Sequence, residues 1–142
     1  MGDVLRGRQP GGAAEPGLGR PAPGPLDPRI VTSLREMAAR SAASAEGIRH
    51  LVSTYLACSD ERALDLKQAA GAGDSDGLAR VAHSLAGSSA SLGACGLASV
   101  CRSIESAAVS GQLSSVPELL SQMEGALAQT RASLLRELLQ DR

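Results

Sequence analysis

The sequence is almost devoid of aromatic residues: it contains no Trp and no Phe, and Tyr55 is its only tyrosine. A hydrophobic core in this chain must therefore be built from Leu, Ala, Val, Ile and Met, which favours closely packed helices over a β-sheet. With 142 residues, 43% of them hydrophobic, the chain is long enough for one domain of ordinary size. The composition thus predicts a small all-α domain.

Lysine is also scarce: Lys67 is the only one. The net charge of the chain is −1. This balance argues against general nucleic-acid binding. No apolar run approaches the roughly 20 residues that a membrane span needs, and the N-terminus lacks the apolar segment of a signal peptide. We therefore expect a cytoplasmic protein that binds neither nucleic acid nor membrane.

The three cysteines, Cys58, Cys95 and Cys101, form no CxxC pair. An odd number of widely spaced thiols is typical of reduced cysteines in the cytosol and not of a disulfide framework. No pair of metal ligands has the usual zinc spacing, so we predict no metal site. Cys101 follows an apolar helical stripe and is expected in the core. A thiol-based sensor built on Cys95 and Cys101 is a less favoured alternative. It is suggested by the position of Cys95 near a helix start, where the pKa of a thiol falls.

The distribution of Pro and Gly divides the chain into two parts. Residues 1–26 are rich in both and offer almost nothing to bury, so we predict a disordered tail. Residues 27–142 contain four long amphipathic segments that begin near positions 45, 75, 94 and 115, preceded by a short helix with Asp27 as its cap and Pro28 in its first turn. Short connections between these segments predict an antiparallel up-down four-helix bundle, with the additional N-terminal helix packed across it.

The most informative segment spans residues 82–94 and places His83 among positions that are almost all Gly, Ala or Ser. At about 100° per residue, Leu78, Leu85 and Leu92 form a buried stripe, and His83 falls roughly 140° from Leu78 and faces solvent. The imidazole therefore lies on a surface nearly free of side chains, where a second protein can bring its own active site close. An exposed neutral imidazole is a good nucleophile toward phosphorus. The simpler interpretation, an ordinary surface histidine, leaves the small residues around it unexplained.

This segment resembles the motif of the histidine-containing phosphotransfer (HPt) domains of bacterial phosphorelays. The family pattern is a His, any residue, Leu, usually Lys, Gly, two small residues, and then Gly-Ala at the next helix. The chain matches this pattern at His83, Leu85, Gly87, Ser88, Ser89, Gly93 and Ala94. Ala86 departs from it, because it occupies the position of the usual Lys, a residue thought to contact the phosphoryl group. The similarity covers about residues 27–140.

The resemblance implies a phosphocarrier and not an enzyme that turns over alone. His83 would accept a phosphoryl group from the aspartate of one receiver domain and pass it to another response-regulator receiver domain. The implied partners are receiver domains and a hybrid sensor histidine kinase. Mg²⁺ is expected in the receiver, so we expect no cofactor in this chain, which we predict to be a monomer. The main alternative is an HPt-like helical adaptor that binds receivers without carrying a phosphoryl group, because the usual Lys is absent at Ala86.

The resemblance also gives a role to Glu105, on the following helix, where it would accept a hydrogen bond from the imidazole and fix its tautomer. Arg80 lies one helical turn before His83 and is the nearest local cation. It is expected to offset part of the phosphoryl charge that a Lys at position 86 would otherwise balance. Helical neighbours of His83 form the predicted docking surface, which comprises Asp76, Ala79, Ser84, Ala86, Gly87 and Ala90.

Overall fold

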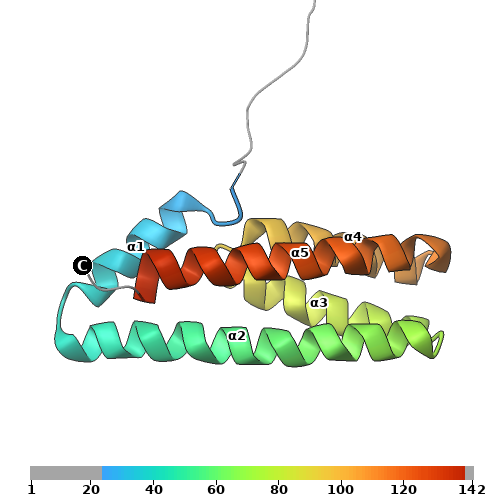
Figure 1. Ribbon diagram of the computed structural model, residues 1–142, viewed down its shortest axis with the longest axis horizontal. Coiled ribbons are helices and arrows are strands. Elements are labelled where there is room, and N and C mark those ends of the chain that lie inside the picture. The colour runs from blue at the N-terminus through green and yellow to red at the C-terminus, as the bar shows by residue number, and fades with distance from the viewer. Residues whose placement is uncertain (1–23, 140–142) are drawn as a thin grey trace, which may run out of the picture.

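The computed structural model describes residues 24–139, and every regular element in this range is helical (Figure 1). The elements are α1 (Pro28–Ala38), α2 (Ala42–Gly71), α3 (Ser75–Ser91), α4 (Cys95–Val109) and α5 (Val116–Leu134), with a short 3-10 turn, η1 (Leu113–Ser115), before α5 and a π-helical turn, η2 (Leu135–Leu139), after it. The described part of the chain thus has the all-α character that the composition predicts.

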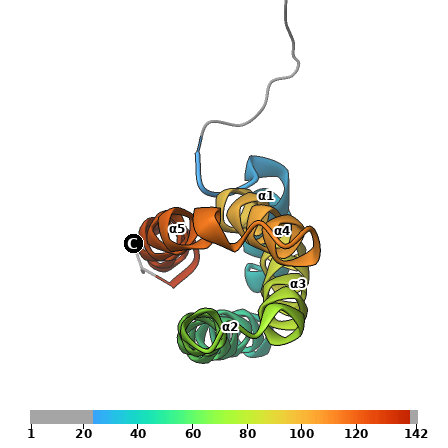
Figure 2. The same ribbon diagram turned by 90° about the vertical axis from the view of Figure 1, so that its right-hand side faces the viewer.

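The four longer helices lie alongside one another, and α1 packs at one end of them (Figures 1 and 2). In the end-on view, α3 and α4 are neighbours, with α2 next to α3 and α5 next to α4 (Figure 2). Contacts between α2 and α5 complete the arrangement. The site described below lies on α3, the helix between α2 and α4.

Aliphatic side chains from all four long helices form the core. Leu66, Leu78, Leu97 and Met123 are fully buried. Because burial of each such side chain contributes about 1.5–3 kcal/mol, a core of this kind needs no aromatic cluster. The single aromatic residue, Tyr55, is also buried and joins α2 to α3, since its hydroxyl lies 2.7 Å from the hydroxyl of Ser89.

Local sequence signals set both ends of α3. At its start, the carboxylate of Asp74 accepts a hydrogen bond from the backbone N–H of Gly77 at 2.9 Å, which caps the helix. Just beyond its end, Gly93 has a φ of 77°, in the left-handed region that favours glycine. The Gly93 carbonyl also accepts a hydrogen bond from the N–H of Asp27 at 2.7 Å. Gly93 therefore provides the tight turn between α3 and α4.

The segment before α1 packs on the helices, which moves the boundary of the predicted tail. Leu26 is only 9% exposed and belongs to the core. The backbone N–H of Gly96 donates to the carbonyl of Pro25 at 3.4 Å. Proline and glycine dominate the composition of this stretch, so composition alone does not indicate that its last leucine, next to α1, is buried in the core. The rest of the predicted tail, residues 1–23, lies outside the described residues.

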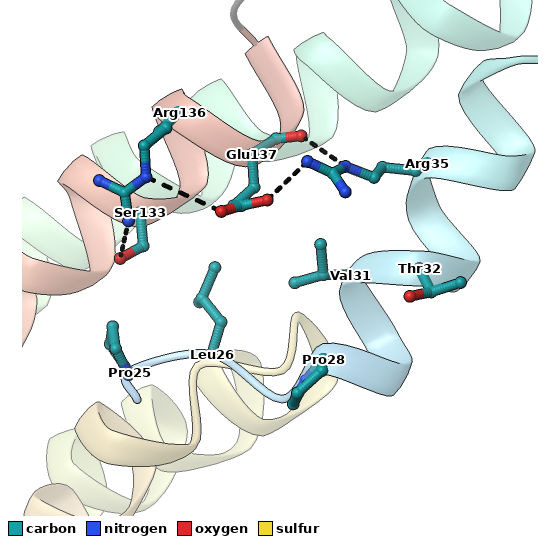
Figure 3. Close-up of a pocket in the computed structure, with 9 residues that line it drawn as sticks. All are labelled: Pro25, Leu26, Pro28, Val31, Thr32, Arg35, Ser133, Arg136 and Glu137. Atoms are coloured by element: carbon teal, nitrogen blue, oxygen red, sulfur yellow. Dashed lines mark hydrogen bonds and ion pairs between the residues drawn. The ribbon is translucent and has the colours of Figure 1, made fainter. Parts of the chain in front are cut away.

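A hollow separates this segment and α1 from the end of α5 (Figure 3). Pro25 and Leu26 line one side of it, and Arg35 of α1 forms an ion pair with Glu137 at 2.6 Å on the other. None of its lining residues belongs to α3 or α4, so this hollow is separate from the surface around His83.

Candidate functional site

His83 lies on the outer face of α3, and 78% of its side chain is exposed to solvent. One turn along the same face, Gly87 is also exposed, and a Cβ built at Gly87 would have no neighbouring atom within 4 Å. One turn in the other direction, Ala79 is half-buried and short. The imidazole therefore lies on a low, open surface and not in a pocket, which is the setting that the sequence predicts.

The carboxylate of Glu105 on α4 holds the imidazole from one side. Its two oxygens lie 3.1 Å and 3.3 Å from Nδ1 of His83. An ionised carboxylate only accepts hydrogen bonds, so Nδ1 carries the proton and donates it. The other nitrogen, Nε2, then has a free lone pair and points away from Glu105 and α4. This arrangement allows nucleophilic attack from Nε2.

The turn at Gly93 brings these two residues together, because it lies midway between positions that are 22 residues apart in sequence. Small buried residues on both helices, Ala82 of α3 and Ala98 of α4, leave room for a close approach of the two backbones. Glu105 is only 32% exposed, so part of its hydrogen bond to the ring is sheltered from water.

The sequence-based prediction that Ala86 lies on the docking surface is wrong. Its exposed fraction is only 5%, so a partner cannot reach it. Ala86 follows His83 by three residues, which places it about 60° around the helix from the histidine. That rotation carries it to the side on which Glu105 binds the ring, where α4 covers it. Helical spacing identifies the outer face of α3 but not how far α4 extends over its edge.

The other predicted docking residues lie at or near the surface around His83. Those that are exposed are Asp76, Ser84 and Gly87, and those that are half-buried are Ala79 and Ala90.

Arg80 is exposed on α3, at the border between the histidine face and α2. It lines a shallow hollow between α2 and α3 together with Asp65 and Asp74. These two acidic residues attract the guanidinium away from a phosphoryl group on His83. The predicted role of Arg80 in charge support therefore stays a prediction, with a competing set of neighbours that the sequence did not reveal.

The structure brings a second arginine to this surface that sequence reasoning missed. Arg62 of α2 is half-buried, and its Nε donates a hydrogen bond to the hydroxyl of Ser84 at 3.4 Å. Ser84 is the residue next to His83. Nothing in the sequence distinguishes Arg62 from the other polar residues of α2, because the two partners are 22 residues apart.

The thiols offer little support for a redox sensor. Cys101 is fully buried in α4, and burial raises its pKa to about 12. A thiol with such a pKa is protonated at neutral pH and reacts slowly, which argues against the alternative that uses Cys101. Cys58 is an exposed free thiol, and Cys95 is a half-buried one.

The described part of the chain lacks the features of two other classes of site. Between residues 24 and 139 there is no group of three or more His, Cys, Asp or Glu side chains arranged to hold a metal ion. Over the same range, no helix has the length and apolar character needed to cross a membrane.

Comparison with known proteins agrees with the geometry around His83. The family model of the Hpt domain matches residues 50–138, a range that includes both His83 and Glu105. The crystal structure of histidine-containing phosphotransfer protein B (HptB) from Pseudomonas aeruginosa PAO1 is similar, with a TM-score of 0.73 and 33% sequence identity. The similarity covers 85% of this chain and 100% of that one. Comparison with curated proteins gives no significant match. Since the family model matches more than half of the chain and the site residues lie within the match, this protein belongs to the Hpt domain family.

Proposed function

We propose that this protein is a phosphorelay phosphocarrier that accepts a phosphoryl group on His83 from a receiver-domain aspartate and passes it to another receiver domain. The observation that carries the proposal is an exposed imidazole whose Nδ1 is held 3.1 Å from the carboxylate of Glu105. Membership of the Hpt family supports the same role. The protein acts as a carrier, without turnover of its own.

In the accepting step, Nε2 of His83 attacks the phosphorus of an aspartyl phosphate. An N–P bond forms while the P–O bond to the aspartate breaks, and the aspartate leaves as a carboxylate. The ring keeps its proton on Nδ1 and becomes positively charged, and the carboxylate of Glu105 offsets this charge. Mg²⁺, if bound by the receiver, would supply positive charge to the moving phosphoryl group. The donating step is the reverse of this sequence with a second receiver.

A monomer in the cytoplasm fits this role, with receiver domains and a hybrid sensor histidine kinase as its partners. We propose that the four long helices form an antiparallel up-down bundle that presents the outer face of α3. Short connections between consecutive helices support this arrangement. The small or short residues around His83 let a receiver bring its aspartate close to Nε2, and the docking surface comprises Asp76, Ala79, Ser84, Gly87 and Ala90.

Incubation of the full chain with a phosphorylated receiver domain and Mg²⁺ tests the proposal. We expect a protein-bound phosphoryl group that is labile in acid, stable in alkali and absent from the His83→Gln variant. The matched control is His50→Gln, since the chain has only two histidines and His50 is exposed on α2. A wild-type chain that takes up no phosphoryl group from any receiver domain of its source organism would overturn the proposal, as would full labelling of His83→Gln.

A second candidate function is a helical adaptor that binds receivers without transfer. It is favoured by Ala86, which fills the position of the usual family Lys with a buried methyl group. Calorimetry with an unphosphorylated receiver distinguishes the two functions when it is combined with the transfer assay. The adaptor predicts binding that His83→Gln leaves unchanged and no phosphoryl transfer, whereas the carrier predicts both binding and transfer.

A further inference from the structure

Arg62 of α2 and Ser84 of α3 form a polar pair beside the histidine. The Nε of Arg62 donates to the hydroxyl of Ser84 at 3.4 Å. Since that hydroxyl accepts the hydrogen bond, its own proton is left to donate to a further group. The two terminal nitrogens of the guanidinium carry four more N–H donors in a planar fork, the geometry that matches phosphate oxygens.

This pair lies on the side of His83 toward which its reactive nitrogen points. Nδ1 donates to Glu105 on α4, so Nε2 is directed away from α4. Ser84 is one residue beyond His83, about 100° around the helix and on the opposite side from Ala86, which α4 covers. Adjacent Cα atoms are only about 3.8 Å apart, and the Arg side chain is long and flexible. A phosphoryl group on Nε2 therefore extends toward the side of α3 that carries the pair.

The other charges around His83 do not provide the same contact. On α3, Asp76 repels a phosphoryl group and Arg80 lies in the hollow lined by carboxylates. On α4, Glu105 is occupied by Nδ1, and Arg102 is on the helix from which Nε2 points away. Arg62 forms no ion pair with any carboxylate in the stretch 24–139, so its charge is available to an incoming anion.

We propose that Arg62 is a phosphoryl-binding residue: its guanidinium, positioned by Ser84, binds the phosphoryl group on Nε2 of phosphorylated His83. This inference rests on the proposed function and adds to it a cation from α2. It assigns Arg62 a contact with the phosphorylated form of the protein that is independent of any receiver.

Chemical phosphorylation tests this contact without a partner protein. The full chain and its variants, each carrying His50→Gln so that His83 is the only histidine, are phosphorylated with potassium phosphoramidate. The phosphohistidine signal is then followed by phosphorus NMR as a function of pH. A nearby guanidinium favours the doubly charged phosphoryl group, so its loss in Arg62→Gln moves the titration midpoint to higher pH. For an exposed pair the displacement is several tenths of a pH unit, at most about 0.7. Ser84→Ala gives a smaller displacement, and Arg62→Lys restores part of the wild-type value.

The matched control is Arg49→Gln, which removes one positive charge from the same helix about 20 Å from Arg62 along its axis. A midpoint in Arg62→Gln equal to those of the wild type and the control would overturn the role of Arg62 and leave the phosphocarrier function intact. Absence of a phosphohistidine signal from the wild-type chain would overturn both. Thermal melts followed by circular dichroism verify that each variant is folded, so that a displaced midpoint reports on the phosphoryl group.

Discussion

Removal of the Glu105 carboxylate is the sharpest perturbation of the proposed carrier. In Glu105→Ala, Nδ1 of His83 loses its acceptor, and the ring is free to rotate and to move its proton to Nε2, the nitrogen that must attack phosphorus. Glu105→Gln keeps a carbonyl oxygen that accepts from Nδ1 but removes the negative charge. The two variants therefore separate the orientation of the ring from the electrostatic support of its positive charge.

The size of the effect follows from the exposure of the pair. A hydrogen bond to a charged group contributes about 1.5–3 kcal/mol when it is sheltered. Here 78% of the histidine side chain and 32% of the glutamate side chain are exposed, so we take the lower limit of that range or slightly less, about 1–1.5 kcal/mol. This corresponds to a transfer rate about fivefold to tenfold lower in Glu105→Ala. In Glu105→Gln, where the hydrogen bond persists, we expect a decrease of about twofold.

Single-turnover transfer from a phosphorylated receiver domain, followed by loss of label from the receiver, measures these rates. Receiver is varied to saturation, so that weaker docking is distinguished from slower transfer within the complex. The melting temperature should be unchanged in both variants, because Glu105 lies at the edge of the α3–α4 contact and not in the core. A transfer rate in Glu105→Ala equal to that of the wild type would refute the orienting role. Equal decreases of the transfer rate in both variants would show that the charge matters more than the hydrogen bond.

Three further outcomes follow from burial and space. Gly87→Glu should abolish receiver docking and transfer without loss of stability. A side chain at this position meets no neighbour in the fold, and Gly favours a helix less than Ala by about 1 kcal/mol. Titration with a receiver measures docking, and a thermal melt measures stability. Deletion of residues 1–23 should leave the melting temperature and transfer unchanged, whereas a deletion that extends through Leu26 should lower the free energy of unfolding by about 1.5–3 kcal/mol in a denaturant titration. At mildly alkaline pH iodoacetamide should modify the exposed Cys58 and spare Cys101, whose pKa of about 12 keeps the thiol protonated; rapid modification of Cys101 in the folded chain, detected by peptide mass mapping, would contradict its burial.

Local patterns were sufficient for the features that depend on one helix at a time. The period of Leu78, Leu85 and Leu92 predicted that His83 faces solvent. The predicted start of its helix near position 75 is where Asp74 caps α3. These features follow from the 3.6-residue repeat and from capping, both of which are encoded within one or two turns of sequence.

Features that depend on the relation between helices could not be read in the same way. Ala86 is buried because α4 extends over the edge of α3, and the period of α3 alone does not give the width of that contact. Arg62 reaches Ser84 because α2 packs on the other flank of α3 in a particular register. Leu26 is buried because its neighbours Pro25 and Asp27 form hydrogen bonds with Gly96 and Gly93, far along the chain. In each case the decisive neighbour lies in a different element, and one sequence does not specify that neighbour.

The buried pair of Tyr55 and Ser89 gives the protein an internal optical reporter. Tyr55 is the only Phe, Trp or Tyr in the sequence, so the aromatic absorption and fluorescence of the protein come from a single position. Its hydroxyl contacts Ser89, fewer than two helical turns beyond His83, and therefore senses how α2 packs on the helix that carries His83. The proposed phosphorylation of His83 should therefore be measurable through this one ring without any label.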